Sequence, residues 1–251
     1  MNLISSKVLQ QLAPHGVLSA GVYLGNFLLV TGRSSSGEPI GIAPDICRAI
    51  ARHLDVELSL HGFNTQDELL EAAVSGSCGI VLLGSDPARA QKVTFTPAYV
   101  ELEACYLVPA DSPITDLSQV DQPGIRIASF YKSAYDLWLQ RNIKYASLVH
   151  ADSVKASNEI FISEKLDALA GLKSGLVSVS QDIPGSRILD GQFTGIQQAI
   201  ATQKSHQESI EFLNACVAEF IESGLVADLI SQYQVRGLSV AKLSKASSEG
   251  K

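Results

Sequence analysis

Apolar residues along the chain alternate between the two spacings expected of strands and of helices. Val56, Leu58 and Leu60 alternate with polar residues, as in a half-buried strand. Just before them, apolar residues at 46, 47, 50, 51 and 54 have the spacing of an amphipathic helix, which Pro44 and Asp45 are expected to open. Further strands are predicted at 17–23, 80–83, 125–129, 146–150 and 195–201, and further helices at 134–139, 154–164, 210–224 and 225–234; a short apolar stretch lies at 166–171.

Helix-start signals sharpen two of these boundaries. Thr65 and Glu68 form a T-x-x-E capping box, and Gly76 is placed to end the helix that follows. Asp86 followed by Pro87 is an N-cap and first-turn pair directly after the buried strand at 80–83. A polar loop is expected at 32–39, and the residues at 244–251 are expected to be frayed. This order of elements predicts an α/β fold with mainly parallel sheets.

Composition limits the function classes. The chain has 251 residues and 46% apolar content, enough for one large or two modest domains. Its net charge of −7 and pI near 5.2 disfavour a nucleic-acid surface, so no nucleic-acid partner is expected. The four cysteines stand far apart without a CxxC pair, which favours buried free thiols, with two disulfides as the alternative.

The N-terminal stretch suggests no targeting segment. It contains no continuous apolar run and no small-residue cleavage signature, and nothing downstream has a membrane-spanning length. The expectation is a protein without a membrane span, cytoplasmic as written and periplasmic if a signal peptide has been removed.

Arg89 is the first candidate for binding chemistry. It lies in the first turn of the helix that Asp86 and Pro87 begin. Ligands of parallel sheets bind outside the carboxyl ends of the strands, where helix-start amides and a guanidinium suit a carboxylate. The alternative is an ordinary surface arginine on a βα turn. In the binding role Arg89 is expected to carry no core packing, so Arg89→Ala should abolish ligand binding and leave the fold intact.

Two segments around these elements share their spacing with one known family. The first is G-x-x-x-G-(F/I)-x-x-D-(I/L), matched by Gly37, Gly41, Ile42, Asp45 and Ile46. The second is T-x-x-R leading to F-(S/T)-x-P-Y, matched by Arg89, Phe95, Thr96, Pro97 and, after one inserted residue, Tyr99. A third, KSAYDLWL at 132–139, is similar to the family's G-S-A-Y-like turn. With these segments the chain resembles, from about 16 to 234, the family 3 solute-binding proteins, the amino-acid-type receptors of ABC importers.

The resemblance implies a two-lobed type II periplasmic-binding-protein fold. Two mainly parallel sheets flanked by helices would be joined by crossover strands near 106–110 and 194–199. Lobe 1 would comprise 1–108 and return at 196–238, lobe 2 would comprise 109–195, and 239–251 would be a polar tail. The implied action is hinge closure on a small molecule in an interlobe cleft, as the substrate-binding component of an ABC transporter with a permease as partner. A monomer without cofactor is expected.

The resemblance also implies site residues. Arg89 matches the arginine that clamps the ligand's carboxylate, with Ser85 and Ser133 as hydrogen-bonding partners. Tyr23, Asn26 and Phe27 follow the first strand, where the family places an aromatic side chain against the ligand. For each the alternative is a loop residue with a purely local role.

Three departures from the family pattern concern the ligand. Leu172 occupies the position of the aspartate that pairs with the ligand's ammonium group. Asp86 replaces the threonine of T-x-x-R, where it either caps its helix or receives a ligand cation, and Lys132 replaces the glycine before Ser133. If Arg89 and Lys132 both face the ligand, an anion without an α-ammonium group is favoured, so a standard α-amino acid is not assumed.

Enzymatic and sensory functions are the alternatives. The histidines are scattered without metal-ligand spacing, and no nucleotide-binding or nucleophile-elbow motif occurs. A lyase similar to cyclohexadienyl dehydratases would need a general acid, for which Asp86, Glu101 and Glu103 are candidates. A cytoplasmic ligand sensor or buffer is the third possibility. We expect non-catalytic binding.

Overall fold

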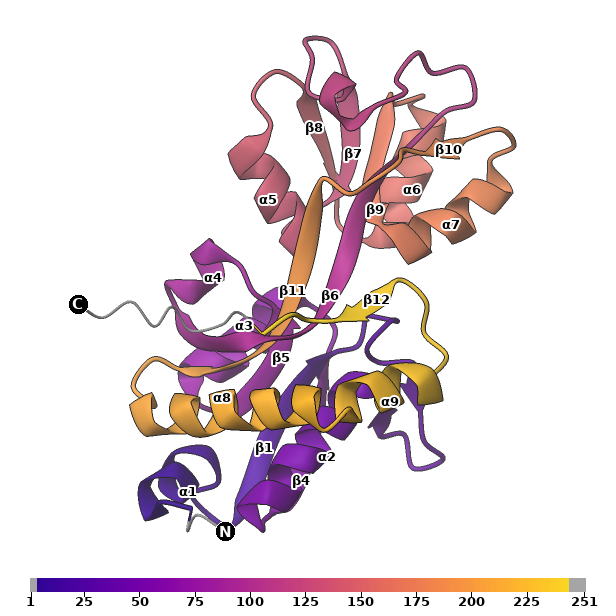
Figure 1. Cartoon of the computed structure of the whole chain (residues 1–251). Coiled ribbons are helices and arrows are strands. Elements are labelled where there is room, and N and C mark those ends of the chain that lie inside the picture. Colours follow the sequence, from indigo (N-terminus) through magenta and orange to yellow (C-terminus); the bar gives the residue numbers. More distant parts are fainter. Residues whose placement is uncertain (1–3, 244–251) are drawn as a thin grey trace, which may run out of the picture. The chain divides into compact units, whose positions relative to one another are not determined.

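The computed structural model describes residues 4–243, which form two compact α/β units (Figure 1). Unit 1 contains the chain up to Glu101 and again from Gln197 onward, and unit 2 contains Leu102–Ile196. The chain passes from one unit to the other twice, within the strands β6 (Val93–Val108) and β11 (Thr194–Gln203). Residues 102–108, assigned to the first lobe from the sequence, lie in unit 2.

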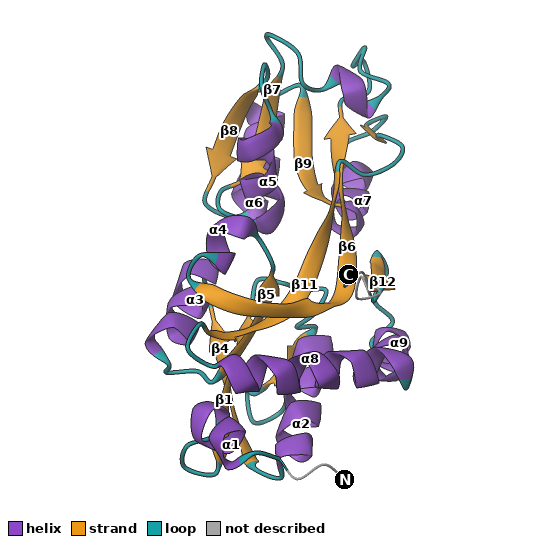
Figure 2. Cartoon of the chain, turned by 60° about the vertical axis from the view of Figure 1, so that its left-hand side comes forward, coloured by secondary structure: helices purple, strands orange, loops and turns teal. Residues whose placement is uncertain are grey.

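Unit 1 is a sheet with helices packed on it. Its strands follow the order β4-β1-β5-β11, in which β1 is parallel to β4 and β5, and β11 is antiparallel to β5 (Figures 1 and 2). The helix α8 contacts both α1 and α9, and α9 contacts α2. Besides β6 and β11, the elements are α1 (Ser6–Leu12), β1 (Val17–Tyr23), β2 (Gly32–Arg33), β3 (Pro39–Ile40), α2 (Ile42–Leu54), β4 (Glu57–Phe63), α3 (Gln66–Ser75), β5 (Ile80–Gly84), α4 (Pro87–Ala90), α8 (Gln207–Glu222), α9 (Leu225–Gln232) and β12 (Leu238–Val240).

Unit 2 repeats the α/β pattern. Its strands follow the order β6-β9-β7-β8; β7 is parallel to both β8 and β9, whereas β9 and β10 are antiparallel to β6. Besides β6, the elements are the short 3-10 helix η1 (Leu117–Gln119), β7 (Arg126–Phe130), α5 (Ala134–Asn142), β8 (Ser147–Ala151), α6 (Val154–Ser163), β9 (Ala168–Leu172), α7 (Lys173–Asp182) and β10 (Arg187–Ile188).

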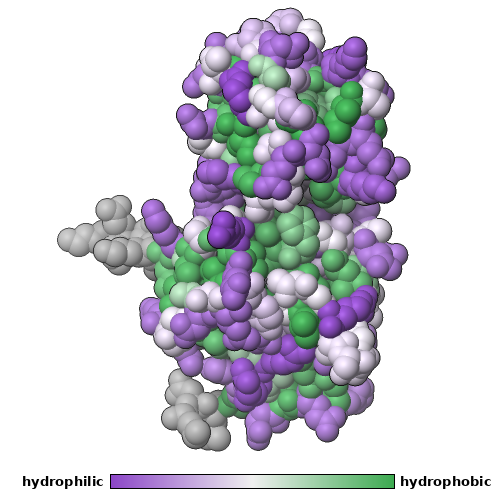
Figure 3. Space-filling model, turned by 90° about the vertical axis from the view of Figure 1, so that its right-hand side faces the viewer, coloured by the Kyte–Doolittle hydropathy of each residue, from purple (hydrophilic) through white to green (hydrophobic). Residues whose placement is uncertain are grey.

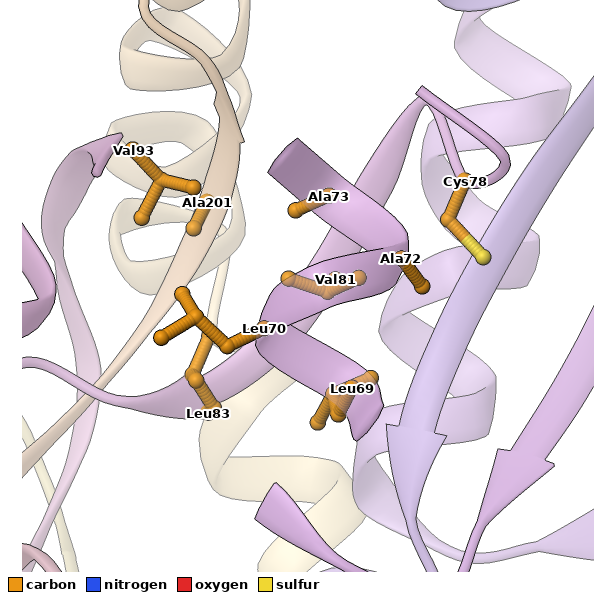
Figure 4. Close-up of a cluster of buried hydrophobic side chains, with 9 residues drawn as sticks. All are labelled: Leu69, Leu70, Ala72, Ala73, Cys78, Val81, Leu83, Val93 and Ala201. Atoms are coloured by element: carbon orange, nitrogen blue, oxygen red, sulfur yellow. The ribbon is translucent and has the colours of Figure 1, made fainter. Parts of the chain in front are cut away.

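The helix α3 packs closely on the sheet of unit 1. Leu69 and Leu70 of α3 lie in one hydrophobic cluster with Val81 and Leu83 of β5 (Figure 4). A Cβ atom at Gly21 of β1 would lie 2.7 Å from Leu69 Cδ1, so any other residue there would force the Leu69 side chain to shift. Burying each large aliphatic side chain contributes roughly 1.5–3 kcal/mol, which holds α3 against the strands.

The start of α2 explains one of the shared sequence segments. Gly41 caps this helix with φ 142°, and a Cβ atom there would lie 2.4 Å from the carbonyl oxygen of Leu29. Asp45 accepts hydrogen bonds from Arg48 Nη1 at 2.7 Å and from the Tyr233 hydroxyl at 2.6 Å. The glycine is therefore needed by the backbone, and the aspartate ties α2 to the end of α9.

The other shared segment joins β6 to β11 and β12 within unit 1. Thr96 Oγ1 accepts a hydrogen bond from the backbone N–H of Ile200 at 3.1 Å. Tyr99 is fully buried, and its carbonyl oxygen accepts from the N–H of Ala241. These residues hold the strands that lead out of unit 1.

The sequence predicted most elements to within a few residues, and several details differ. The expected loop at 32–39 is closed by the short β2–β3 hairpin, and α2 begins at Ile42 rather than at Pro44. The expected polar tail at 239–251 begins inside β12, which pairs with β6. The prediction of a frayed end at 244–251 lies outside the described residues. All four cysteines are buried free thiols, as predicted.

Exposed hydrophobic side chains are dispersed over both units. The most exposed are Tyr145 at 64% and Ile162 at 55%, which lie on separate segments of unit 2. On the face shown in Figure 3, hydrophobic residues are bordered by hydrophilic ones in each unit. Single exposed apolar residues are normal on protein surfaces and indicate no particular partner.

Candidate functional site

The carboxyl edge of the sheet in unit 1 collects most of the predicted binding residues. Tyr23 is in register with Phe63 of β4, and Val22 is in register with Leu82 of β5, so these parallel strands end at one edge. Tyr23 ends β1, and Asn26 and Phe27 lie in the loop that follows it. Ser85 and Asp86 lie in the turn after β5, and Arg89 lies in the short helix α4 that this turn begins. Both groups therefore leave the sheet at the edge where parallel sheets bind ligands.

Arg89 is a buried cation at this edge. Its side chain is only 5% exposed, Nη1 donates to the carbonyl oxygen of Gly84 at 2.7 Å, and Nη2 donates to Oε1 of Gln66. Burial lowers the pKa of Arg89 to about 10, an effect that the carboxylates of Asp86 and Asp67 partly oppose. The guanidinium keeps its charge at neutral pH, because its pKa remains well above 7. The expectation that Arg89 carries no core packing was wrong, since the side chain is enclosed.

The turn around Arg89 is built as the sequence predicted. Asp86 is the N-cap of α4, and its Oδ1 accepts from the N–H of Ala88 at 2.8 Å, with Pro87 in the first turn. The backbone N–H of Ser85 donates to the carbonyl oxygen of Gln197 in β11. Asp86 thus has a structural role, and Ser85 connects the turn to the neighbouring strand.

The loop after β1 places a buried hydrogen-bond acceptor, without a partner in the described part of the chain, near the carboxyl edge of the sheet in unit 1. Tyr23 packs against the cluster under α3, and burial raises the pKa of its hydroxyl. Oδ1 of Asn26 is buried and has no hydrogen-bond partner among residues 4–243. Phe27 is 49% exposed. This loop therefore places an amide group and an aromatic ring near the carboxyl edge of the sheet.

In unit 2, Lys132 and Ser133 cap the helix α5. Lys132 has φ 60°, the left-handed region that favours glycine, which is the residue the family usually has here. Its backbone N–H donates to Oδ2 of Asp136 at 2.9 Å, and Ser133 Oγ accepts from the N–H of Asp136 at 3.2 Å. The start of α5 is therefore capped by its own side chains.

Leu172 ends β9, beside β7 and running parallel to it, so its place is at the same edge of unit 2 as Lys132 and Ser133. It is the N-cap of α7 but makes no side-chain capping bond. The next residue, Lys173, has its Nζ 2.6 Å from Oε2 of Glu103. An apolar side chain thus occupies the position where an ammonium partner was sought.

Sequence reasoning missed two residues beside Lys132. The Tyr131 ring lies 4.9 Å from the His150 ring between centroids, and Lys132 Nζ lies 5.6 Å from the Tyr131 centroid. His150 Nε2 is 3.1 Å from Oδ1 of the fully buried Asp136, a contact without the alignment of a hydrogen bond. The available signal was the two predicted strands at 125–129 and 146–150, which pair in the structure and place Ser129 next to His150.

The three carboxylates considered for acid catalysis have structural partners. Asp86 caps α4, Glu101 accepts from Nε2 of Gln197, and Glu103 pairs with Lys173. Among residues 4–243, no group of three or more histidine, cysteine, aspartate or glutamate side chains could hold a metal ion. Within the same residues, every helix is too short or too polar to cross a membrane.

Comparisons with known proteins point to one family. The model of the "Bacterial extracellular solute-binding proteins, family 3" matches residues 27–236. A search of curated protein sequences found no match. Many solved structures share the fold.

Three solved structures illustrate this likeness. One is described as a binding component of an ABC transporter from Wolinella succinogenes, complexed with lysine, with 19% identity, 87% of this chain and 95% of that chain covered, and a TM-score of 0.72. Another is a cysteine-binding protein from Campylobacter jejuni, with 16% identity, coverage of 96% and 97%, and a TM-score of 0.71. The third is the ancestral amino-acid-binding protein AncCDT-1, a precursor of cyclohexadienyl dehydratase, with 18% identity, coverage of 90% and 98%, and a TM-score of 0.71. They confirm the predicted type II periplasmic-binding-protein fold.

Proposed function

Because the chain belongs to the bacterial extracellular solute-binding proteins of family 3, we propose that it binds a small carboxylate-bearing ligand without converting it. The observation that carries this proposal is the buried guanidinium of Arg89 at the carboxyl edge of β5. A planar guanidinium can hold a carboxylate through two parallel hydrogen bonds. Strongly shifted pKa values in such positions mark candidate functional sites, and the pKa of Arg89 is lowered to about 10.

Residues around Arg89 suit the rest of a small ligand. Asn26 offers a buried acceptor without a partner among the described residues, and Phe27 offers an exposed ring on the same edge of the sheet. We propose that Arg89 holds the ligand's carboxylate and that the loop after β1, with Tyr23, contacts its remainder. Ser85 and Asp86 support the turn that carries the arginine.

The residues of unit 2 favour an anionic ligand. Leu172 cannot pair with an ammonium group, whereas Lys132 and Ser133 stand at the carboxyl edge of β7. We propose that these residues contribute to the site and that organic acids or modified amino acids suit it better than standard α-amino acids. The opposite preference would indicate that another acceptor replaces the missing aspartate.

We propose transport as the physiological role. Members of the family are described as extracellular, and this favours periplasmic action over the cytoplasmic alternative. The proposed partner is an ABC permease, to which the ligand-bound protein would deliver its cargo. A fluorescent fusion of the full-length protein would test the compartment, and loss of ligand uptake on deletion would test the transport role.

Hinge closure is a separate proposal that the family resemblance implies. A ligand that contacts both lobes stabilises the closed state by its differential contacts with the two conformations. Small-angle X-ray scattering would detect a smaller radius of gyration when a stabilising compound is added. An unchanged radius at saturation would contradict closure while leaving binding itself in place.

A thermal-shift screen tests the binding proposal directly. The purified protein would be screened against amino acids, opines, organic acids and amines, with prephenate and arogenate included. A ligand at a hundredfold excess over its dissociation constant stabilises by about 2.7 kcal/mol. A stabilising carboxylate recovered unchanged supports the proposal. Conversion of the compound during incubation would instead make the protein an enzyme, and stabilisation only by amines without a carboxylate would contradict the role of Arg89.

A further inference from the structure

A contact between two helices holds the Arg89 side chain in one orientation. Gln66 is the first residue of α3, and its Oε1 accepts a hydrogen bond from Arg89 Nη2 on α4. Nη1 of the same guanidinium donates to the carbonyl oxygen of Gly84 at the end of β5. Because the guanidinium is planar, acceptors on both terminal nitrogens set the direction of the plane as well as its position.

Gln66 itself stands on a well-anchored helix start. Thr65 Oγ1 accepts from the N–H of Glu68 at 3.2 Å, and Glu68 Oε2 accepts from the N–H of Thr65 at 3.2 Å. In the next turn Leu69 is fully buried against the sheet. An acceptor on such an element can hold a charged side chain in a fixed geometry, as pre-organised sites require.

We propose that Gln66 is a positioning residue of the binding site, whose amide oxygen orients the Arg89 guanidinium toward the ligand's carboxylate. This inference rests on the proposed function of Arg89. The charges of Asp86 and Asp67 already act on Arg89, and the neutral amide of Gln66 orients the guanidinium without adding a further negative charge. A carboxylate at position 66 would add one more ion pair to Arg89 and oppose the binding of a ligand carboxylate more strongly.

The orienting contact can be tested without any ligand. Selective ¹⁵N labelling of arginine would show the guanidinium protons of Arg89 by NMR, with Arg89→Lys used for assignment. In the native chain we expect the guanidinium protons of Arg89 to exchange slowly with water and to give separate signals. In Gln66→Ala we expect faster exchange with water and signals averaged by rotation of the guanidinium. Gln91→Ala, an exposed glutamine beside α4, is the matched control and should leave the signals unchanged. Native-like Arg89 signals in Gln66→Ala would overturn the inference.

Variants that differ in charge at residue 66 distinguish a positioning role of Gln66 from a purely structural one. Gln66→Glu keeps an acceptor for Arg89, so we expect its Tm to equal or exceed that of the native chain. Gln66→Met removes the acceptor at similar size and should lower the Tm. Using succinate and L-lysine as probes, we expect Gln66→Glu to weaken binding at least tenfold and Gln66→Met to weaken it several-fold. If both Gln66→Glu and Gln66→Met lose affinity only in proportion to their loss of Tm, the positioning role of Gln66 is overturned.

The NMR comparison and the binding measurements together distinguish a failure of this inference from a failure of the proposed function on which it rests. Native affinity in Gln66→Glu, with native binding of a probe intact, would overturn the inference and leave the proposed function standing. If neither succinate nor L-lysine binds the native chain, the proposed function fails for these two compounds. The NMR comparison then decides whether Gln66 orients Arg89.

Discussion

The hydroxyl of Tyr233 donates to the carboxylate of Asp45 at 2.6 Å, which joins the residue after α9 to the first turn of α2. Burial raises the pKa of this hydroxyl to about 12, and the hydrogen bond to the carboxylate and its charge act in the same direction. Tyr233→Phe should therefore lower the free energy of unfolding by about 1–3 kcal/mol at pH 7, measured by urea denaturation. Tyr145→Phe is the control, since that ring is 64% exposed.

The hydroxyl of Tyr233 should also make the free energy of unfolding depend on pH in the alkaline range. Its folded pKa is above the ordinary value of 10, so its contribution to stability is present below pH 10 and is lost as the pH rises toward about 12. The stability difference between the native chain and Tyr233→Phe should shrink over this interval. A constant difference from pH 9 to pH 12 would show that the hydroxyl does not titrate as the structure indicates.

Gly41 and Gly37 provide a matched pair of backbone substitutions. Both have positive φ angles, but a Cβ atom at Gly41 would lie 2.4 Å from the oxygen of Leu29, whereas at Gly37 it would meet nothing within 4 Å. We expect Gly37→Ala to cost about 1 kcal/mol of stability and Gly41→Ala to cost about 3 kcal/mol or more. Urea denaturation of both variants would measure the difference, and equal costs would contradict the close approach.

Substitution of Arg89 should affect stability as well as binding. Arg89→Ala removes the donor to the carbonyl oxygen of Gly84 and to Gln66, at a cost of about 1–3 kcal/mol. Arg89→Lys keeps the charge but loses the planar fork, so it should retain most of the stability and bind a carboxylate at least tenfold more weakly. Thermal unfolding and calorimetric titration would separate the two effects, with Arg52→Ala on the exposed side of α2 as the control. Native affinity in Arg89→Lys would refute the carboxylate role.

Leu172 should influence which ligands are accepted. Leu172→Asp would place a carboxylate at the end of β9, where it could pair with an ammonium group. We expect this variant to gain several-fold in affinity for compounds that carry an α-ammonium group and to lose affinity for simple organic acids. Leu172→Asn is the uncharged control, and a thermal-shift comparison of both variants would measure the change. An identical ligand profile in all three proteins would place Leu172 outside the site.

Much of the fold could be read from local patterns. The capping box of Thr65 and Glu68 and the start of α4 at Asp86 and Pro87 occur where the sequence predicted them. These signals act over three or four residues, so the chain carries them wherever the rest of the fold places the segment. The helices α1 and α7 and the strand β12 were missed. The helix α1 is short, α7 contains a glycine and two valines with low helix propensity, and β12 is defined by its partner strand.

The candidate site was predictable only in part. Arg89 was identified from its place after a buried strand and from the family resemblance, and its role in the ligand's binding stays a prediction. Its enclosure and its contact with Gln66 were not predicted, since the two residues are separated by 23 positions. The cluster of Tyr131 and His150 was missed for the same reason, as two strands and a helix bring it together.

The sequence by itself determined the order of strands and helices, the helix caps and the family, because each depends on spacing between near neighbours in the chain. Tertiary structure alone decided that Arg89 is buried with a lowered pKa and that Gln66 accepts its hydrogen bond. It also decided that Asp45 binds a tyrosine 188 positions away. Burial and hydrogen bonding depend on which distant segments fold against each other, and linear spacing does not specify those contacts.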